Sequence, residues 1–178
     1  MSTAELLNVL AKLDKLLDQY RIGYIVIGSL ADYLLGISAI KPNDIDILVD
    51  KEDIEELNTV FQQERGIAML ELIRWREESI IRGLYGRALL DKTVIDIMAD
   101  VQLKYSDKWI LFTYRKLLPC TIEARLTNTI TVRIPCPEIR VIADRALGRL
   151  DRARAIGDVI EKKRCNVRVG RCLSTINH

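Results

Sequence analysis

Residues 24–49 read YIVIGSLADYLLGISAIKPNDIDILV, and this stretch decides the fold. The apolar run at its start ends in Gly28 and Ser29, so it predicts a short buried strand that passes directly into a helix over residues 29–35. The segment at its end, residues 44–49, predicts a second strand because aliphatic residues alternate there with two aspartates. The sequence therefore predicts two strands with a helix between them.

Asp44 and Asp46 are separated by a single residue on the second predicted strand. Successive side chains of a strand point to opposite faces, so the two carboxylates share one face while Ile45, Ile47 and Val49 fill the other. Two adjacent carboxylates are costly to bury unless cations neutralise them, and hard oxygen donors of this kind suit Mg²⁺ or Mn²⁺. The spacing therefore predicts a divalent-metal site.

A third carboxylate, Asp96, stands inside the apolar run VIDIM at residues 94–98. Aspartate is disfavoured in strands, so this placement favours a role as a further metal ligand. The alternative is an exposed charge on an edge strand, where it discourages aggregation. With Asp44 and Asp46, this residue completes the skeleton of a two-metal phosphoryl-transfer site, and the three aspartates are the candidate catalytic and metal-binding residues.

Gly28 and Ser29 allow two interpretations. A glycine at a strand-to-helix turn leaves room for phosphate oxygens, and the helix N-terminus supplies N–H donors, which predicts a phosphate-binding turn. The same pair is also an ordinary helix N-cap. Because a single predicted helix separates this turn from the two aspartates, the signals reinforce each other, and we favour the phosphate interpretation.

The rest of the chain predicts further helices and a mixed sheet. Helices are expected over residues 4–20, 51–63, 138–148 and 151–163, and strands over 68–75, 80–90, 93–98, 121–125 and 130–134, with a tight turn at 91–92. Residues 109–118 leave helix and strand open. We therefore expect an α/β (α+β) fold, in which a mixed β-sheet is flanked by helices and followed by a C-terminal helical pair.

The chain has 178 residues, of which 49% are hydrophobic and 29% charged, enough for one core with a helical appendage. We divide it into a core at 1–134, a helical section at 135–164 and a tail at 165–178. No apolar run approaches the roughly 20 residues of a membrane span, so we expect a cytoplasmic protein without membrane contact. The one histidine, His178, is the last residue, so acid–base chemistry is expected to fall to carboxylates.

Positive charge gathers at the C-terminal end: the section from residue 137 onward carries a formal net charge of +5, and the rest carries −3. A basic section beside an acidic site suits a nucleoside triphosphate or RNA, although a solvated helix face is the alternative. We place Arg145, Arg149 and Arg152 on one helical face as candidate phosphate ligands. The alternative pairs them on the surface with acids such as Asp144.

The segment VIGSLADYLLG at residues 26–36, followed by DIDI at 44–47, resembles the signature of the DNA polymerase beta nucleotidyltransferase superfamily, and most of all its small prokaryotic nucleotidyltransferase-like proteins. The resemblance implies a nucleotidyltransferase fold. It also implies a turn on the triphosphate, an aspartate pair on the metals and a third carboxylate on a later strand, matched here by Gly28, Ser29, Asp44, Asp46 and Asp96. Many small relatives carry an arginine just before the aspartates, and this chain has Lys41 near that place. Relatives also often carry a lysine on the penultimate helix, where this chain has Arg145 and Arg149.

This resemblance implies a metal-dependent enzyme that transfers an NMP from an NTP to a hydroxyl acceptor and releases pyrophosphate. The acceptor is left open between RNA, a small molecule and a protein, and so are the NTP and a homodimer. The alternative is a non-catalytic nucleotide- or partner-binding regulatory module, as in toxin–antitoxin pairs, but retention of all three acids favours an enzyme. A metal-dependent phosphodiesterase is less attractive because it needs a group that activates water.

Overall fold

The computed structural model describes residues 2–127 and 130–163. Its helices are α1 (Thr3–Gln19), α2 (Gly28–Leu34), α3 (Ile54–Gln63), α4 (Tyr114–Leu117), α5 (Pro137–Ala146) and α6 (Leu150–Lys163), with 3-10 turns at η1 (Lys51–Asp53) and η2 (Leu118–Cys120). Its strands are β1 (Tyr24–Ile27), β2 (Ile45–Val49), β3 (Ile67–Glu77), β4 (Ile81–Leu90), β5 (Thr93–Tyr105), β6 (Lys108–Phe112), β7 (Thr121–Arg125) and β8 (Thr131–Pro135).

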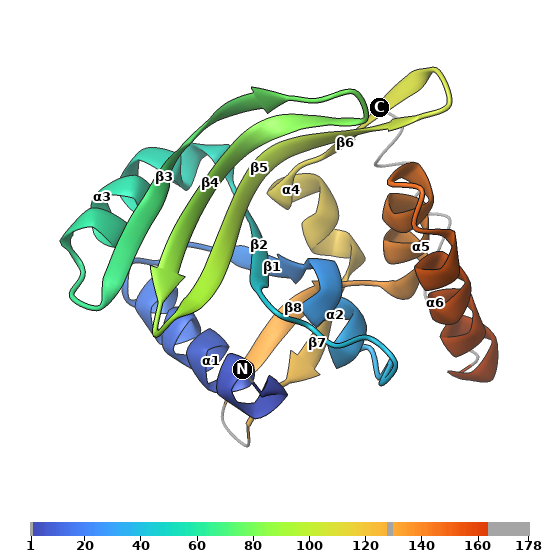
Figure 1. Cartoon of the computed structure of the whole chain (residues 1–178), viewed down its shortest axis with the longest axis horizontal. Coiled ribbons are helices and arrows are strands. Elements are labelled where there is room, and N and C mark those ends of the chain that lie inside the picture. The colour runs from blue at the N-terminus through green and yellow to red at the C-terminus, as the bar shows by residue number, and fades with distance from the viewer. Residues whose placement is uncertain (1, 128–129, 164–178) are drawn as a thin grey trace.

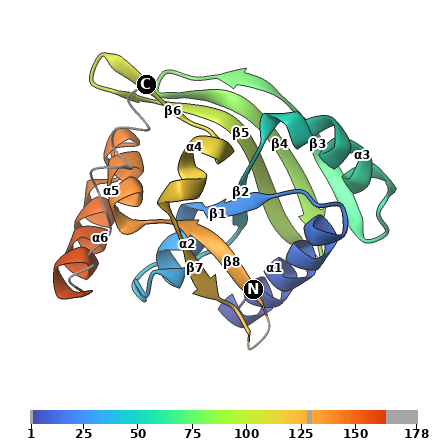
Figure 2. The same ribbon diagram turned by 180° about the vertical axis from the view of Figure 1, so that it is seen from behind.

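The main sheet has the strand order β1-β2-β5-β4-β3, with β6 paired to the distal half of β5. Strands β2 and β5 are parallel and their other neighbours are antiparallel, which confirms the predicted mixed sheet. The long strands β3, β4 and β5 arch over the molecule, while α5 and α6 lie side by side at one end (Figure 1). Seen from behind, the separate β7–β8 hairpin lies beside β1 (Figure 2). The fold is thus mixed α/β with flanking helices and a C-terminal helical pair.

Local sequence signals explain the first helix and the central strand. Ser2 caps α1, and its side chain and that of Glu5 form a reciprocal capping box. On β2 the side chains of Ile45, Ile47 and Val49 are fully buried, as the alternation predicts. The apolar face of β2 therefore fixes which way its aspartates point.

A β-bulge shapes the wall of the site. Strand β5 runs well beyond the predicted 93–98, because Asp100 adopts a φ of +48° and lets the strand continue past an irregularity opposite Gly83, whose φ is +154°. Beyond the bulge the buried side chains of β5 point to the opposite face of the sheet. Val101 and Leu103 therefore join the hydrophobic cluster on the side that faces α5. The distal half of β5 thereby becomes an apolar wall.

Residues 109–118, left open between helix and strand, contain parts of both. Strand β6 ends at Phe112, and Thr113 then accepts a hydrogen bond from the backbone N–H of Lys116 and caps the short α4. The predicted hairpin at 121–125 and 130–134 is confirmed, with β8 displaced by one residue. The predicted 51–63 helix begins with a 3-10 turn.

The arginine-rich section forms two helices, so the prediction that Arg145, Arg149 and Arg152 share one helical face is wrong. Gly148 has a φ of +71°, which ends the helical path after α5. One arginine therefore lies on α5, one in the connecting turn and one on α6. The proposed boundaries of the core and helical section stay predictions, and the tail at 165–178 lies outside the described residues.

No helix within the described part of the chain is both long enough and apolar enough to cross a membrane.

Candidate active site

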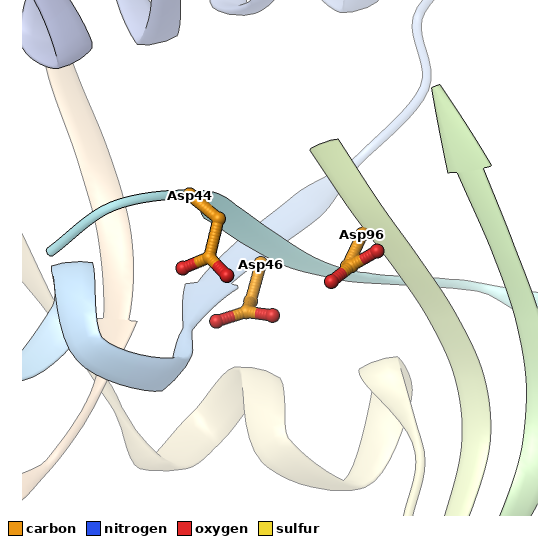
Figure 3. Close-up of side chains that lie close together, drawn as sticks. All are labelled: Asp44, Asp46 and Asp96. Atoms are coloured by element: carbon orange, nitrogen blue, oxygen red, sulfur yellow. The ribbon is translucent and has the colours of Figure 1, made fainter. Parts of the chain in front are cut away.

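Three aspartates from two neighbouring strands converge on one face of the sheet (Figure 3). Asp46 on β2 and Asp96 on β5 are direct partners in the parallel register, and Asp44 immediately precedes β2. One carboxylate oxygen of each residue lies within 4.8 Å of the others. Strand β5 lies between β2 and β4, so the edge-strand alternative for Asp96 is wrong. The strand boundary predicted at Asp44 shifts by one residue, because sheet pairing begins at Ile45.

Like charges make this cluster unfavourable on its own. Burial, followed by the neighbouring charges of Asp44 and Asp96, raises the pKa of Asp46 to about 7. The positive charges of Arg140 and Arg149 oppose that shift. A divalent cation would relieve the repulsion, and three hard oxygen donors match the ligand preference of Mg²⁺ or Mn²⁺. The residues present therefore fit a divalent-metal site.

Two polar contacts orient the carboxylates. Arg87 on β4 donates to both oxygens of Asp96, at 2.6 Å from Nε and 3.1 Å from Nη2. This bidentate pair fixes the Asp96 carboxylate plane. The Ser29 hydroxyl donates to Asp44 over a long 3.5 Å. Arg87 could not be identified from the sequence, because only the register of β4 against β5 places it opposite the aspartate.

The backbone of Gly28 lies directly against the Asp46 carboxylate, and this is possible because glycine has no side chain. Its φ is +66°, and a Cβ atom built there would lie 1.8 Å from Oδ2 of Asp46. The register of β1 against β2, which sets Ile27 opposite Asp46, explains this closeness. Any larger residue at this turn must displace the central carboxylate of the cluster.

Replacing Gly28 by alanine is expected to weaken divalent-metal binding at the three aspartates by about 100-fold or more. Displacing a carboxylate ligand should cost at least as much as losing a supporting residue around a metal site, which typically costs 10–100-fold. Ser29→Ala loses one long hydrogen bond and should cost less than about tenfold. Calorimetric titration of both variants tests this, with thermal melts as the folding control. Equal affinities of the folded Gly28→Ala variant and the parent would refute the assignment.

A buried ionic network ties the turn to the C-terminal helices. The Arg140 guanidinium on α5 donates to both carboxylate oxygens of Asp32 on α2, at 2.7 and 3.0 Å, and to Asp144 at 3.3 Å. The two aspartates are completely buried and the arginine is 5% exposed. Arg149 and Arg152 also approach Asp144, at 3.9 and 4.0 Å, so the alternative that pairs these arginines with Asp144 is confirmed for the partners, but the carboxylate is buried and does not lie at the surface. Sequence analysis missed this network, although an aspartate within the apolar LADYLL segment was a usable signal.

A cleft of about 340 Å³ adjoins the aspartates. Its polar lining comes from Gly28, Asp46, Glu78, Arg140 and Arg149. The rest is mainly apolar and is lined by residues of β2, β5, β6, α4 and α5, among them Leu48, Met98, Val101, Phe112, Leu117 and Ile139. The cleft thus combines charged groups, one of them the central aspartate, with a largely apolar lining.

The structure brings one of the three predicted basic residues to this cleft. Arg149 lines it, with its side chain half exposed. Arg145 is exposed on α5, and Lys41 is exposed in the loop before β2; neither lies among the residues that line the cleft. Their nucleotide-binding roles stay predictions.

The metal-free protein is expected to lose stability as the pH rises from about 4 to about 7. Asp46 binds its proton more tightly in the folded protein than in the unfolded chain, so the folded state holds more protons across this range and its unfolding free energy falls with pH. Urea unfolding in EDTA at several pH values tests this. The fall should be smaller for Asp46→Asn, and an identical pH profile for both proteins would contradict the assignment.

Comparison with known proteins identifies the fold. No protein-family model and no curated protein sequence matches the chain. Among solved structures, a Thermotoga maritima protein provisionally described as a nucleotidyltransferase matches with a TM-score of 0.70 and 23% identity, over 91% of this chain and 96% of that one. The solution structure of the antibiotic-resistance factor ANT(2″)-Ia matches with a TM-score of 0.57 and 14% identity, over 99% of this chain and 91% of that one.

The crystal structure of ANT(2″)-Ia with adenylyl-2″-tobramycin gives a TM-score of 0.57 and 13% identity, over 96% of this chain and 97% of that one. At these identities the similarity establishes the architecture. The chain has the nucleotidyltransferase fold, which confirms the fold implied by the sequence resemblance.

Proposed function

We propose that this protein is a metal-dependent nucleotidyltransferase that transfers an NMP from an NTP to a hydroxyl acceptor and releases pyrophosphate. The observation that carries the proposal is the convergence of Asp44, Asp46 and Asp96 beside a glycine turn. Retention of all three acids favours catalysis over the non-catalytic regulatory alternative. The ANT(2″)-Ia complex, whose ligand is an adenylylated tobramycin, supports a hydroxyl acceptor by analogy.

The three aspartates have different proposed roles, which follow from their positions on the two strands. Asp44 and Asp46 would hold Mg²⁺ or Mn²⁺ beside the Gly28 turn, and Asp96 on the neighbouring strand would complete the second metal site and is the candidate proton acceptor. A metal held there would neutralise the charge of the triphosphate and lower the pKa of the attacking hydroxyl. The chain itself contributes in-line positioning of the reactants and a proton acceptor.

The bond changes balance without a further reactant. The acceptor oxygen forms a bond to the α-phosphorus, and the bond from that phosphorus to the oxygen bridging to the β-phosphorus breaks. Asp96 takes the hydroxyl proton and passes it to solvent, while Arg87 keeps the carboxylate oriented. Pyrophosphate leaves with the electrons of the broken bond.

The cleft beside Asp46 suits the nucleotide. Arg149 lines this cleft and is the candidate ligand of the triphosphate, and the apolar lining suits the base. Lys41 and Arg145 are secondary candidates for phosphate contacts, and Ser29 is a candidate hydrogen-bond donor. This arrangement puts the base between the arched sheet and α5.

Arg149→Ala is expected to weaken NTP binding and to reduce its dependence on salt, because it removes a charge that contacts phosphate. Arg154→Ala is the comparison variant: it removes the same charge from an exposed position on α6 outside the cleft. Titrations across a salt series measure both quantities. If Arg149→Ala keeps the parental affinity and salt slope, this arginine does not bind phosphate.

Transfer is tested by incubating the protein with Mg²⁺, each α-phosphate-labelled NTP, and separate pools of RNA, metabolites and protein. The proposal expects label in one pool, together with released pyrophosphate. If no pool gains label while Mg²⁺ and NTP still bind, the non-catalytic alternative is favoured.

A further inference from the structure

The Arg140 guanidinium on α5 keeps one nitrogen atom accessible. Its side chain is 6% exposed, and Arg140 is among the residues that line the cleft beside Gly28 and Asp46. Nε and Nη2 donate to aspartates, whereas Nη1 makes no hydrogen bond within the described part of the chain. Nη1 is also not among the unpaired polar atoms of the described residues that are closed off from solvent. The accessible part of this side chain therefore provides a free N–H donor at the cleft.

Two buried carboxylates hold the Arg140 guanidinium in a fixed plane. Asp32 on α2 accepts from Nε and Nη2 at 2.7 and 3.0 Å, and Asp144 on α5 accepts from Nη2 at 3.3 Å. Both carboxylates are completely buried, and a bidentate pair of this kind sets the orientation of the guanidinium. Nη1 is thus directed before any ligand binds, which reduces the entropy cost of binding an anion there.

The charges of this buried network leave a positive surplus at the cleft. Asp32 and Asp144 carry two negative charges, and three arginines lie within 4.0 Å of their carboxylate oxygens, namely Arg140, Arg149 and Arg152. Of these arginines, Arg140 and Arg149 line the cleft. An anion in the cleft would balance the surplus charge, and its attraction is stronger beside an apolar lining than in water.

We propose that Arg140 binds the outer phosphates of the NTP, with Nη1 donating to an oxygen of the β- or γ-phosphate beside Arg149. In the proposed function, on which this assignment rests, the α-phosphate lies at the three aspartates and the base in the apolar part of the cleft. Burial raises the pKa of Asp46, and Arg140 lies close enough for its charge to oppose that rise. Arg140 is thus near the phosphates without being a metal ligand, which suits the β–γ end and the charge that the leaving pyrophosphate gains.

The test measures how strongly binding depends on the number of phosphates. AMP and the α,β-methylene analogues of ADP and ATP, which cannot transfer their nucleotide, are titrated with Mg²⁺ into the parent and into Arg140→Lys. Lysine keeps the positive charge for Asp32 but lacks the planar fork that serves the aspartates and a phosphate together. We expect the preference for the ATP analogue over AMP to fall about tenfold in this variant, and AMP affinity itself to change less than about threefold. The ADP analogue assigns the loss to the β- or the γ-phosphate.

A compensated variant separates this role from a purely structural one. Arg140→Met combined with Asp32→Leu and Asp144→Leu removes the buried charges together, so much of the parental stability should be retained. Its preference for the ATP analogue should nevertheless fall about 10–100-fold, the range of a hydrogen bond to a charged group. A purely structural network predicts instead that the preference returns with the stability.

The matched control is Arg154→Lys, which changes an exposed arginine of α6 outside the cleft and should bind like the parent. Thermal melts establish which variants are folded. No preference for the ATP analogue in the parent, or the parental preference in folded Arg140→Lys or in the folded triple variant, overturns the inference.

If none of the nucleotides binds the parent, the proposed function fails, and Mg²⁺ with inorganic pyrophosphate then decides the role of Arg140. Pyrophosphate should bind the parent about tenfold more tightly than Arg140→Lys, because it carries the same two phosphate groups. Equal affinities, or no binding to the parent, overturn the inference.

Discussion

Asp46→Asn is expected to reduce nucleotidyl transfer by about 10³-fold or more while leaving the fold intact. The substitution keeps the side-chain volume but removes the central ligand charge, and loss of one electrostatic stabiliser alone typically costs about 10²–10³-fold. Because the pKa of Asp46 is raised to about 7, the uncharged asparagine should leave the metal-free protein at least as stable as the parent at pH 8. Label transfer and urea unfolding measure the two effects.

The matched control for this substitution is Asp91→Asn. Asp91 lies in the β4–β5 turn with a φ of +49°, a conformation that asparagine adopts readily, and pairs with Lys12 at the surface. This variant should keep full transfer activity. Unfolding of Asp46→Asn, with a normal Asp91→Asn, would favour a structural role for Asp46 over a catalytic one.

Arg140→Met is expected to destabilise the protein by about 3–5 kcal/mol, since it removes the hydrogen-bonded partner of the buried carboxylates of Asp32 and Asp144 and leaves them only longer contacts of 3.6–4.0 Å to Arg149 and Arg152. Arg154→Met is the comparison, because Arg154 makes an exposed pair at 3.6 Å and should cost about 1 kcal/mol or less. Urea unfolding gives both values.

A compensated variant tests the reason for the Arg140 effect. Combining Arg140→Met with Asp32→Leu and Asp144→Leu removes the buried charges together, and replacement of a whole buried ion network by apolar residues is often close to neutral. The triple variant should therefore regain much of the lost stability. If the single change costs less than about 1 kcal/mol, the network does not hold α2 against α5.

Local patterns predicted the parts of the fold that depend on neighbouring residues. The helix over residues 4–20 and the alternation around Asp46 each depend on a few neighbouring residues, and both predictions are confirmed. The predicted end of the fifth strand near residue 98 is wrong. A residue with positive φ at Asp100 is tolerated there because the partner strand supplies Gly83 at the bulge, and the sequence does not reveal which segments will be paired.

The candidate site was predictable in its ligands and unpredictable in its surroundings. The sequence pattern picked out three aspartates, and the parallel register of β2 and β5 brings them together. The partners Arg87 and Arg140 were missed. One depends on the antiparallel register of β4 with β5, and the other joins residues 108 positions apart in the chain. Asp32 within an apolar segment is a local signal, but the sequence does not reveal which residue pairs with it.

The most direct test of the central claim is calorimetric titration of ATP, CTP, GTP and UTP into the parent protein, once with Mg²⁺ and once with EDTA. The account predicts that at least one NTP binds with Mg²⁺, that EDTA abolishes this binding, and that Asp44→Asn or Asp46→Asn also abolishes it. Nucleotide binding that is equal with and without the metal, or no binding of any NTP, would contradict the assignment of the three aspartates as a metal site for nucleotidyl transfer.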